Sequence, residues 1–202
     1  MIFWGFYESA EMRLIPKYIN PDLPVIELGA SLGIVSSRAI ACIKSSTSYI
    51  CIEANPHLIP YIEENVKRHN PGKATVTIEN LAIAYNGADS VHINITSNNT
   101  QGRINYQRDE ASSSLKVKAT NLQPYSSVDF TLICDIEGME IEVIKHDQQA
   151  LLNCRHLFIE LHKTWYFEDM FGVEQLKDLI LALGFHLIER DGNVFYFKKP
   201  AP

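Results

Sequence analysis

Apolar and polar positions form blocks along the chain, and these blocks predict strands and helices in alternation. The short apolar or β-branched runs expected to be buried strands are 25–28, 48–53, 75–78, 129–134 and 155–161. The segments with apolar residues at helical spacing are 34–43, 56–69, the stretch from about 139, and 173–183. A strand, a helix and a strand in this order form a right-handed parallel crossover. The pattern predicts a doubly wound, mostly parallel α/β sheet with a ligand crevice at the carboxyl ends of its strands.

The two ends of the chain and one internal stretch depart from this alternation. Residues 8–20 have helical spacing, so we expect a lead-in helix within residues 1–24 that packs against the sheet. The tail over 185–197, with a turn at Asp191-Gly192, predicts an antiparallel hairpin. Strands are expected at 90–95 and 114–118. The nearly all-polar segment between them, 96–113, is either a loop over the substrate site or a solvated excursion.

Length, charge and cysteine content narrow the classes of protein. The 202 residues fit one domain, 1–202, with a full core. A formal net charge of -6, without a large cluster of basic residues, argues against a nucleic-acid partner and favours a small or neutral substrate. The four cysteines lack C-x-x-C spacing, so we interpret them as reduced core residues and expect a cytoplasmic protein. No membrane span or signal peptide is expected.

A glycine turn follows the first predicted strand and is the first sign of a cofactor site. Gly29 lets the backbone turn, and Gly33 lets the next helix lie close to strand and ligand. The dinucleotide fingerprint requires glycine at 31 and 34, where this chain has Ser31 and Ile34. The spacing therefore favours S-adenosylmethionine over NAD. A purely structural tight turn is the alternative.

Carboxylates near the ends of the predicted strands could bind such a cofactor. Glu53 ends the second strand, where its two oxygens can accept hydrogen bonds from both ribose hydroxyls, although a helix-cap or surface role is the alternative. Glu27 is predicted to bind the amino-acid ammonium of the cofactor or to hold the loop. Asn80 and Leu81 follow the third strand and are placed to contact adenine.

Two further clusters converge on the same crevice. Asp135 and Glu137 follow a strongly apolar strand, where a charged group must be solvated, paired or used. His162 follows the strand that contains Glu160, at a place where a neutral imidazole could take a proton from a substrate hydroxyl. The alternatives are a structural histidine and, for Glu137 and Glu140, favourable charges at a helix N-terminus. A divalent metal held by Asp135, Glu137 and Glu160 is compatible with the sequence but not required by it.

These stretches resemble the FkbM family of S-adenosylmethionine-dependent methyltransferases, over about Phe6 to Phe197. The matching stretches are Phe6-Tyr7-Glu8, 25–33, 53–56, 80–82, 134–140 with 143–145, and 159–162. The most specific part is Asp135-x-Glu137-Gly-x-Glu140 with the later Glu160-x-His162. The family usually has aspartate and asparagine in place of Glu27 and Ser31. The resemblance implies a class I (Rossmann-like) methyltransferase fold and, typically, O-methylation of a hydroxyl on a sugar, glycan or related natural product.

The resulting hypothesis is an S-adenosylmethionine-dependent O-methyltransferase. His162 or Asp135 removes the hydroxyl proton, and Glu137 orients the substrate or the base. The expected cofactor-binding residues are Glu27, Gly29, Ala30, Ser31, Gly33, Glu53, Ala54, Asn80, Leu81 and Asp135. Loose candidates for contacts with a glycan acceptor are Asn98, Asn99, Arg103 and Tyr106. The alternatives are a nicotinamide-dependent oxidoreductase and a non-catalytic cofactor-binding module. Because the N-terminal segment is short for such an enzyme, a homo-oligomer that completes the substrate pocket also stays open.

Overall fold

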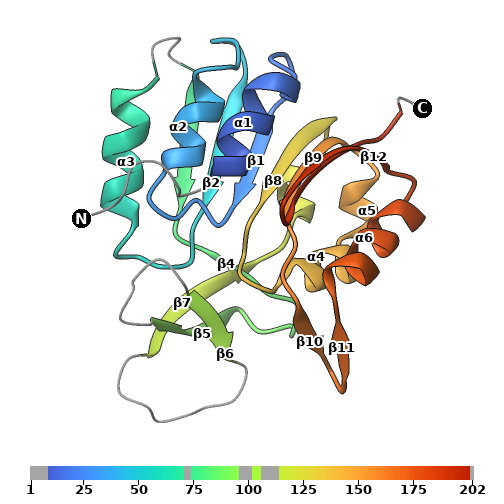
Figure 1. The fold of residues 1–202 in the computed structure, drawn as a ribbon. Helices are drawn as coiled ribbons and strands as arrows, with labels where there is room; N and C mark the ends of the chain where they lie inside the picture. Colours follow the sequence, from blue (N-terminus) through green and yellow to red (C-terminus); the bar gives the residue numbers. More distant parts are fainter. Residues whose placement is uncertain (1–8, 71–73, 96–101, 106–113, 201–202) are drawn as a thin grey trace.

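A seven-stranded sheet with the order β12-β13-β9-β8-β1-β2-β3 forms the centre of the computed structural model, which describes residues 9–70, 74–95, 102–105 and 114–200 (Figure 1). Its strands are β1 (Val25–Leu28), β2 (Ser48–Ile52), β3 (Thr75–Glu79), β8 (Phe130–Cys134), β9 (Cys154–Glu160), β12 (His186–Asp191) and β13 (Val194–Lys198). The five strands from β3 to β9 are parallel, and β13 is antiparallel to both β9 and β12. The structure thus confirms the predicted mostly parallel sheet with its antiparallel C-terminal hairpin.

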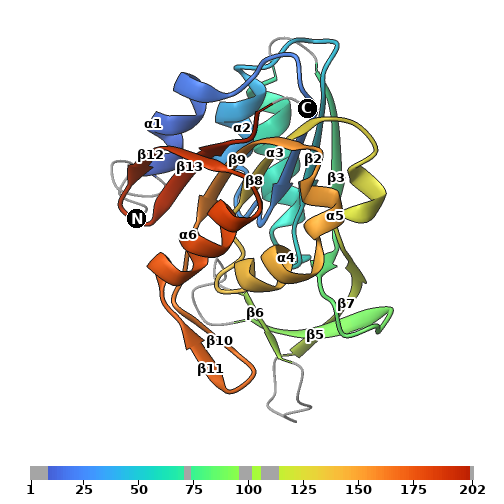
Figure 2. The ribbon, with the colours of Figure 1, turned by 90° about the vertical axis from the view of Figure 1, so that its right-hand side faces the viewer.

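Helices cover both faces of this sheet (Figure 2). The helices on one face are α1 (Ser9–Tyr18), α2 (Ile34–Ile40) and α3 (Ile59–Arg68), and those on the other are α4 (Glu140–His146), α5 (Gln148–Leu151) and α6 (Val173–Ala182). Alternation along the strands supplies an apolar surface to each layer. In β1, for example, Val25 packs under α1 and α2, whereas Ile26 and Leu28 face the layer of α4 to α6. Helix α1 occupies the segment in which the sequence predicts a lead-in helix.

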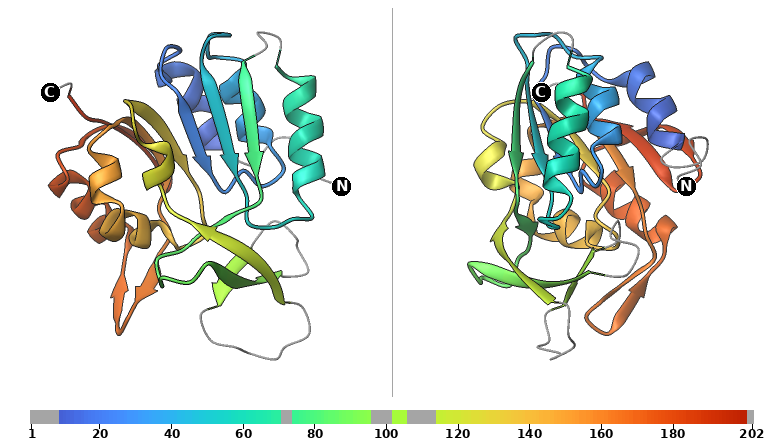
Figure 3. Two further views of the ribbon diagram at one scale, coloured as in Figure 1. Left: turned by 180° about the vertical axis from the view of Figure 1, so that it is seen from behind. Right: turned by 90° about the vertical axis from the view of Figure 1, so that its left-hand side faces the viewer.

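A small second sheet lies beyond the carboxyl ends of the parallel strands (Figure 3). Its order is β4-β7-β5-β6, formed by β4 (Ala82–Ile83), β7 (Ser114–Thr120), β5 (Ser90–Ile95) and β6 (Gly102–Asn105). Strand β6 corrects the prediction of a loop over the whole polar segment, because residues 102–105 pair with 92–95 of β5. The rest of that segment, 96–101 and 106–113, lies outside the described residues.

Two short elements between β7 and α6 were not predicted. A single 3₁₀ turn, Gln123–Tyr125, precedes β8, and a two-stranded hairpin of β10 (Thr164–Tyr166) and β11 (Asp169–Phe171) follows β9. The hairpin begins two residues after His162, so it starts at the edge of the predicted site.

Three of the four cysteines lie in the core as predicted, whereas Cys42 is only partly buried. All four cysteines are free thiols, and Cys51, Cys134 and Cys154 are buried. In the parts of the chain that the structure describes, no helix is long and apolar enough to cross a bilayer.

Candidate functional site

The predicted crevice lies where the order of the sheet reverses. Chain connections run from β1 outward to β2 and β3 on one side, while β8 and β9 lie on the other side of β1. Ligands in doubly wound sheets bind at such a switch point, outside the carboxyl ends of the strands. Here the residues that follow the two central strands are Gly29 and Asp135. Gly29 has a φ of +83°, and a Cβ at this position would overlap the main-chain oxygen of Asp135. Only glycine therefore lets the two strand ends meet.

The turn after β1 is built on positive φ angles at alternate residues. Gly29, Ser31 and Gly33 have φ values of 83°, 50° and 76°. A Cβ on Gly33 would lie 3.0 Å from Cα of Ile62, because α3 packs directly against the turn. Ser31 takes the left-handed conformation without being glycine, which is a strained choice that clusters at ligand sites.

Glu53 links this turn to the end of β2. Its carboxylate accepts hydrogen bonds from the Ser31 N–H at 2.8 Å and the Asn55 N–H at 2.7 Å, one on each oxygen. Burial raises the pKa of Glu53, and these amide donors partly offset the effect. A carboxylate has about four acceptor positions, so at least one stays open beside these donors and the backbone N–H of Ala54. The arrangement fits the two hydroxyls of a ribose.

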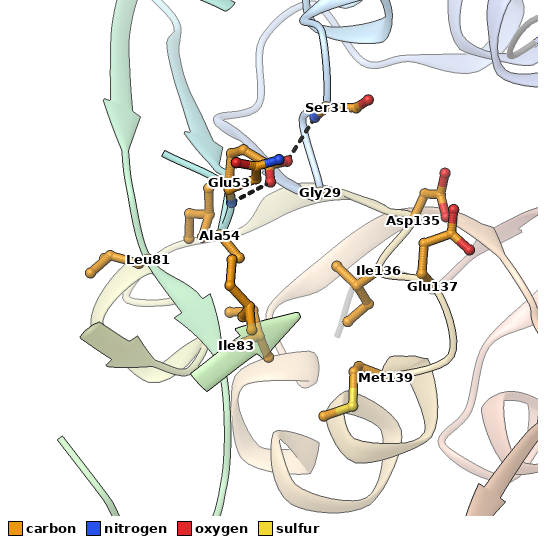
Figure 4. Close-up of a pocket in the computed structure, with 13 residues that line it drawn as sticks. Gly29, Ser31, Glu53, Ala54, Leu81, Ile83, Asp135, Ile136, Glu137 and Met139 are labelled. Carbon is orange, nitrogen blue, oxygen red and sulfur yellow. Dashed lines mark hydrogen bonds between the residues drawn. The ribbon is translucent and has the colours of Figure 1, made fainter. Parts of the chain in front are cut away.

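The main cavity opens between this glutamate and the loop after β8, and encloses about 720 Å³ including its open mouth. Figure 4 shows Glu53 and Ser31 on one side of it, with Asp135 and Glu137 on the opposite side. The predicted residues that line it are Gly29, Ser31, Glu53, Ala54, Leu81, Asp135 and Glu137. The lining residues that sequence reasoning missed are Ile52, Asn55, Ile83, Ile93, Ile136 and Met139. Most of these are apolar, so the cavity combines an apolar wall with polar groups, as a site for a nucleoside requires.

Other predicted cofactor residues shape the site without lining the main cavity. Ala30 and Gly33 lie within the turn itself. Asn80 donates from Nδ2 to the main-chain oxygens of Glu53 and Ala54, both at 2.9 Å, and so holds the end of β2. Glu27 is only 2% exposed and accepts hydrogen bonds from the hydroxyls of Ser36 and Tyr49. Their contacts with a cofactor stay predictions.

His162 lies outside the main cavity, at the centre of a group of carboxylates. Its Nδ1 is 3.0 Å from Glu140 Oε1 and 4.0 Å from Asp135 Oδ1. Its Nε2 is 3.9 Å from Glu137 Oε2 and 3.8 Å from Glu160 Oε1. Because both ring nitrogens face carboxylates, the site favours the doubly protonated imidazolium. The hydrogen bond to Glu140 is the largest cause that raises the pKa of His162.

Asp135 belongs to the same group of carboxylates, and its surroundings disfavour its ionised form. Burial and the negative charge of Glu160 raise the pKa of the Asp135 carboxyl, and His162 acts in the other direction. Its Oδ1 is buried and has no hydrogen-bond donor among the described residues. An aspartate with a raised pKa beside a cavity has the properties of a general base.

The fully buried Glu140 also fixes the loop that carries Asp135 and Glu137. Its Oε1 accepts hydrogen bonds from the backbone N–H groups of Ile136 at 3.2 Å and Gly138 at 3.1 Å. Within this loop Glu137 has a φ of +54°, and Gly138 follows with +101°. The left-handed backbone of Glu137, which lines the main cavity, is a strained conformation of the kind that clusters at ligand sites.

One subset of these side chains is close enough to share a cation. Single ligand atoms of Asp135, Glu140 and His162 lie within 4.8 Å of one another. The set that the sequence allows but does not require is Asp135 with Glu137 and Glu160. The hydrogen bond from His162 to Glu140 accounts for the short distance, so we assign no metal to this group, and no step below depends on one.

Comparison with known protein families shows to which family the chain belongs. The model of the methyltransferase FkbM domain matches residues 27–187, which include the glycine turn, Glu53, Asp135 and His162. The chain belongs to this family. Within the matched range, the Asp135 to Glu140 loop and His162 come together in one polar cluster.

Solved structures show the same fold at low sequence identity. The chain is similar to magnesium protoporphyrin IX methyltransferase from Synechocystis PCC 6803, solved with bound SAH, with a TM-score of 0.54, 9% identity, and coverage of 95% of this chain and 80% of that one. The chain is also similar to the ribosomal protein L11 methylase from Lactobacillus delbrueckii subsp. bulgaricus. The TM-score is 0.52 and the identity is 11%, with coverage of 97% of this chain and 81% of that one. The FkbM protein thus has the class I methyltransferase fold that the sequence predicts. The comparison with curated proteins finds no match.

Proposed function

We propose that this FkbM protein is an S-adenosylmethionine-dependent O-methyltransferase that acts on a hydroxyl group of a sugar, a glycan or a related natural product. The observation that carries the proposal is the position of Asp135. It lines the main cavity beside the glycine turn and also belongs to the carboxylate group around His162. A base at this position lies between the cavity proposed for the nucleoside and the polar cluster around His162, where the acceptor hydroxyl would bind.

The shape and polarity of the main cavity support the cofactor part of the proposal. Glu53 is placed for the ribose hydroxyls, and Leu81, Ile83 and Ile93 supply an apolar wall for adenine. The absence of a Cβ at Gly29 lets the main chain of Asp135 approach the glycine turn closely, which places Asp135 beside the cofactor cavity. The similar Synechocystis methyltransferase was solved with SAH. S-adenosylmethionine, when bound, supplies the sulfonium methyl group that is transferred to the acceptor oxygen.

The environment of the two candidate bases favours Asp135 over His162. The acceptor hydroxyl loses its proton as its oxygen forms the bond to carbon and the sulfur–carbon bond breaks. His162 is hydrogen-bonded to Glu140 and faces three more carboxylates, so it retains its own proton at neutral pH. Asp135 lines the main cavity and its Oδ1 has no donor among the described residues, so in its ionised form it can take the proton. His162 then stabilises the negative charge of the cluster and orients its carboxylates.

An aromatic hairpin next to the site supports a sugar-like acceptor. Thr164, the first residue of β10, lies against Gly138 in the loop after β8. Trp165 is 64% exposed and Phe167 at the hairpin turn is more exposed still. Exposed aromatic faces can stack on the apolar face of a sugar ring, which suits a glycan or a related natural product. The four acceptor contacts suggested in the polar segment include Asn98, Asn99 and Tyr106, which lie outside the described residues, and Arg103 in β6.

Two measurements test the proposed function. Calorimetry should detect binding of S-adenosylhomocysteine and no binding of NADH. Tritium from methyl-labelled S-adenosylmethionine should enter sugar or glycan acceptors, and Asp135→Asn should reduce the rate by about 100-fold or more because the base is lost. Asp178→Asn, a change of the same type on the exposed face of α6, should leave the rate unchanged.

The same measurements can contradict the proposal in separable ways. Tight binding of NADH in place of S-adenosylhomocysteine would indicate the nicotinamide oxidoreductase. Binding of S-adenosylhomocysteine without transfer to hydroxyl, amine or protein acceptors would indicate the non-catalytic module. Transfer to nitrogen alone would retain the methyltransferase and reject O-methylation. Full activity in Asp135→Asn would remove Asp135 as the base.

A further inference from the structure

The hairpin of β10 and β11 presents one face to the protein and the other to solvent. Trp165 and Met170 are cross-strand partners, and they are 64% and 38% exposed. Thr164, Tyr166 and Phe171, which lie on the opposite face by the alternation of the strands, are partly buried. Side chains of directly opposed residues in a hairpin are neighbours, so Trp165 and Met170 form one continuous apolar surface.

The inner face fixes the hairpin on the end of α4. The Tyr166 hydroxyl lies 3.2 Å from Nε2 of His146, and the Tyr85 ring stacks on the same imidazole with the ring centroids 5.0 Å apart. In Figures 1 and 2 the hairpin projects beyond the carboxyl ends of the parallel strands, as the small sheet does. The contacts join the hairpin to α4 and to the chain just after β4, so its outer face has a defined position.

The hairpin follows directly on the residues proposed for methyl transfer. Thr164 Oγ1 would lie 3.2 Å from a Cβ at Gly138, so the inner face touches the loop that carries Asp135. Trp165 comes three residues after His162, and an extended chain advances by no more than about 3.6 Å per residue, so their Cα atoms are within about 11 Å. Trp165 does not line the main cavity. A sugar ring on the outer face is therefore near the ring that reacts beside Asp135, but it is a different ring.

The size and charge of this surface decide between its possible occupants. Trp165, Phe167 and Met170 are the exposed apolar side chains of the hairpin, and together they offer on the order of a few hundred Å². A stable contact with a second copy of the chain buries roughly 800 Å² on each partner. The tip also exposes Glu168 and Asp169, which repel an anionic lipid surface. A small uncharged ring with an apolar face and hydroxyl groups, such as a sugar unit, fits both limits.

We propose that the acceptor is a chain of at least two sugar units, and that Trp165 and Met170 bind a unit beyond the one that is methylated. The apolar face of this unit stacks on the indole, and the indole N–H donates to one of its hydroxyls. The subsite selects acceptors by length, because a single sugar beside Asp135 does not reach the outer face of the hairpin. The inference rests on the proposed function, since it takes a sugar hydroxyl as the methyl acceptor.

Fluorescence of Trp165 tests the contact itself. The chain has two tryptophans, so Trp4→Phe leaves Trp165 as its single indole. This variant, saturated with S-adenosylhomocysteine, is titrated with glucose, mannose and N-acetylglucosamine and with their linear oligomers of two to four units. Oligomers of the accepted sugar should change the emission of Trp165 in a saturable way, whereas the corresponding monosaccharide should leave it unchanged.

The kinetics of tritium transfer separate the subsite from the reacting centre. Trp165→Ala should raise the KM for the best oligomer acceptor about 10-fold, with kcat nearly unchanged, because it removes the stacking contact and no reacting group. The KM for the monosaccharide should stay at the wild-type value. Tyr61→Ala removes an aromatic ring that is 55% exposed on α3, and should match wild type for both acceptors. Thermal unfolding verifies that both variants are folded.

The contrary results are separable. Equal changes of KM for oligomer and monosaccharide in Trp165→Ala, no change for either, or an unchanged Trp165 emission with every oligomer overturns the subsite and leaves the proposed function standing. A response of the emission to phosphatidylglycerol vesicles and to no sugar would make the hairpin a lipid contact. Self-association in sedimentation that is lost in Trp165→Ala would make it an interface between copies, and either result also overturns the subsite. Absence of transfer to every sugar, with S-adenosylhomocysteine bound, contradicts the glycan part of the proposed function first and the subsite with it.

Discussion

The imidazole of His162 lies with Nδ1 3.0 Å from Oε1 of Glu140, a carboxylate that is completely buried. This contact is the largest cause of the raised pKa of His162. We therefore expect Glu140→Gln to lower the pKa of His162 towards that of a free histidine, because an amide oxygen carries no full negative charge. An NMR titration of the ring proton on Cε1 measures the change directly.

A neighbour on the same helix gives the matched control for this prediction. Glu142 lies on α4 near His146 and is not among the carboxylates around His162. In Glu142→Gln the titration of His162 should match wild type. An unchanged pKa of His162 in Glu140→Gln would show that the other three carboxylates hold the proton by themselves.

The close meeting of Gly29 and Asp135 predicts a severe effect of a single methyl group. A residue other than glycine in the left-handed conformation costs about 1–2 kcal/mol, and at Gly29 the Cβ would also overlap the oxygen of Asp135. Gly87 has a similar φ of +73° but open space around the new Cβ. Gly87→Ala should therefore lower the melting temperature by roughly 2–8 °C, and Gly29→Ala by clearly more, with loss of S-adenosylhomocysteine binding. Similar melting temperatures for the two variants would contradict the steric argument.

The carboxylate of Glu53 should determine cofactor affinity. Glu53→Gln keeps the size of the side chain but leaves one of the N–H groups of Ser31 and Asn55 without its acceptor. It also removes the charge from the predicted ribose contact. Hydrogen bonds to charged groups contribute about 1.5–3 kcal/mol, so affinity for S-adenosylhomocysteine should fall about 10- to 100-fold by calorimetry. Glu63→Gln, on the exposed face of α3, should bind like wild type. Equal affinity in Glu53→Gln would reject the ribose contact.

The parts of the fold that could be predicted are those with a local signal. Buried parallel strands such as β8 are continuous apolar runs, so they are visible in the sequence. Strand β6 has no such signal, because Gly102–Asn105 is held by its pairing with β5 and not by its own apolar pattern. The hairpin of β10 and β11 has two three-residue strands, which are too short to show an alternation.

The site likewise divides into residues with a local sequence signal and contacts that depend on tertiary structure. Gly29, Glu53 and Asp135 follow or end apolar strands, so a sequence pattern places them at one edge of the sheet. The contact between Glu140 and His162 depends on the loop of Glu137 and Gly138, where the chain reverses through two positive φ angles. No periodic pattern encodes such a turn. The apolar wall at Ile83 and Ile93 was missed for a similar reason, since it requires knowing where the small sheet lies.

The buried Glu27 predicts how stability depends on pH. Burial raises its pKa to about 7 in the folded protein, against 4.5 when it is exposed. Between these two values the folded state binds more protons than the unfolded state, so the free energy of unfolding falls as pH rises. Glu27 contributes roughly 3 kcal/mol to this fall between pH 4.5 and pH 7. Below pH 4.5 the side chain is protonated in both states, so it adds no pH dependence there.

Glu27→Gln removes this titration while keeping an oxygen acceptor for Ser36 and Tyr49. Urea unfolding at pH 5 and pH 8 should therefore show a smaller loss of stability for the variant than for wild type, whatever the absolute stability of each. Glu63→Gln should reproduce the wild-type difference, because that side chain is exposed in α3. An equal loss in wild type and Glu27→Gln would mean that Glu27 is ionised in the folded state at pH 5. Its hydrogen bonds with Ser36 and Tyr49 would then outweigh the cost of burying the charge.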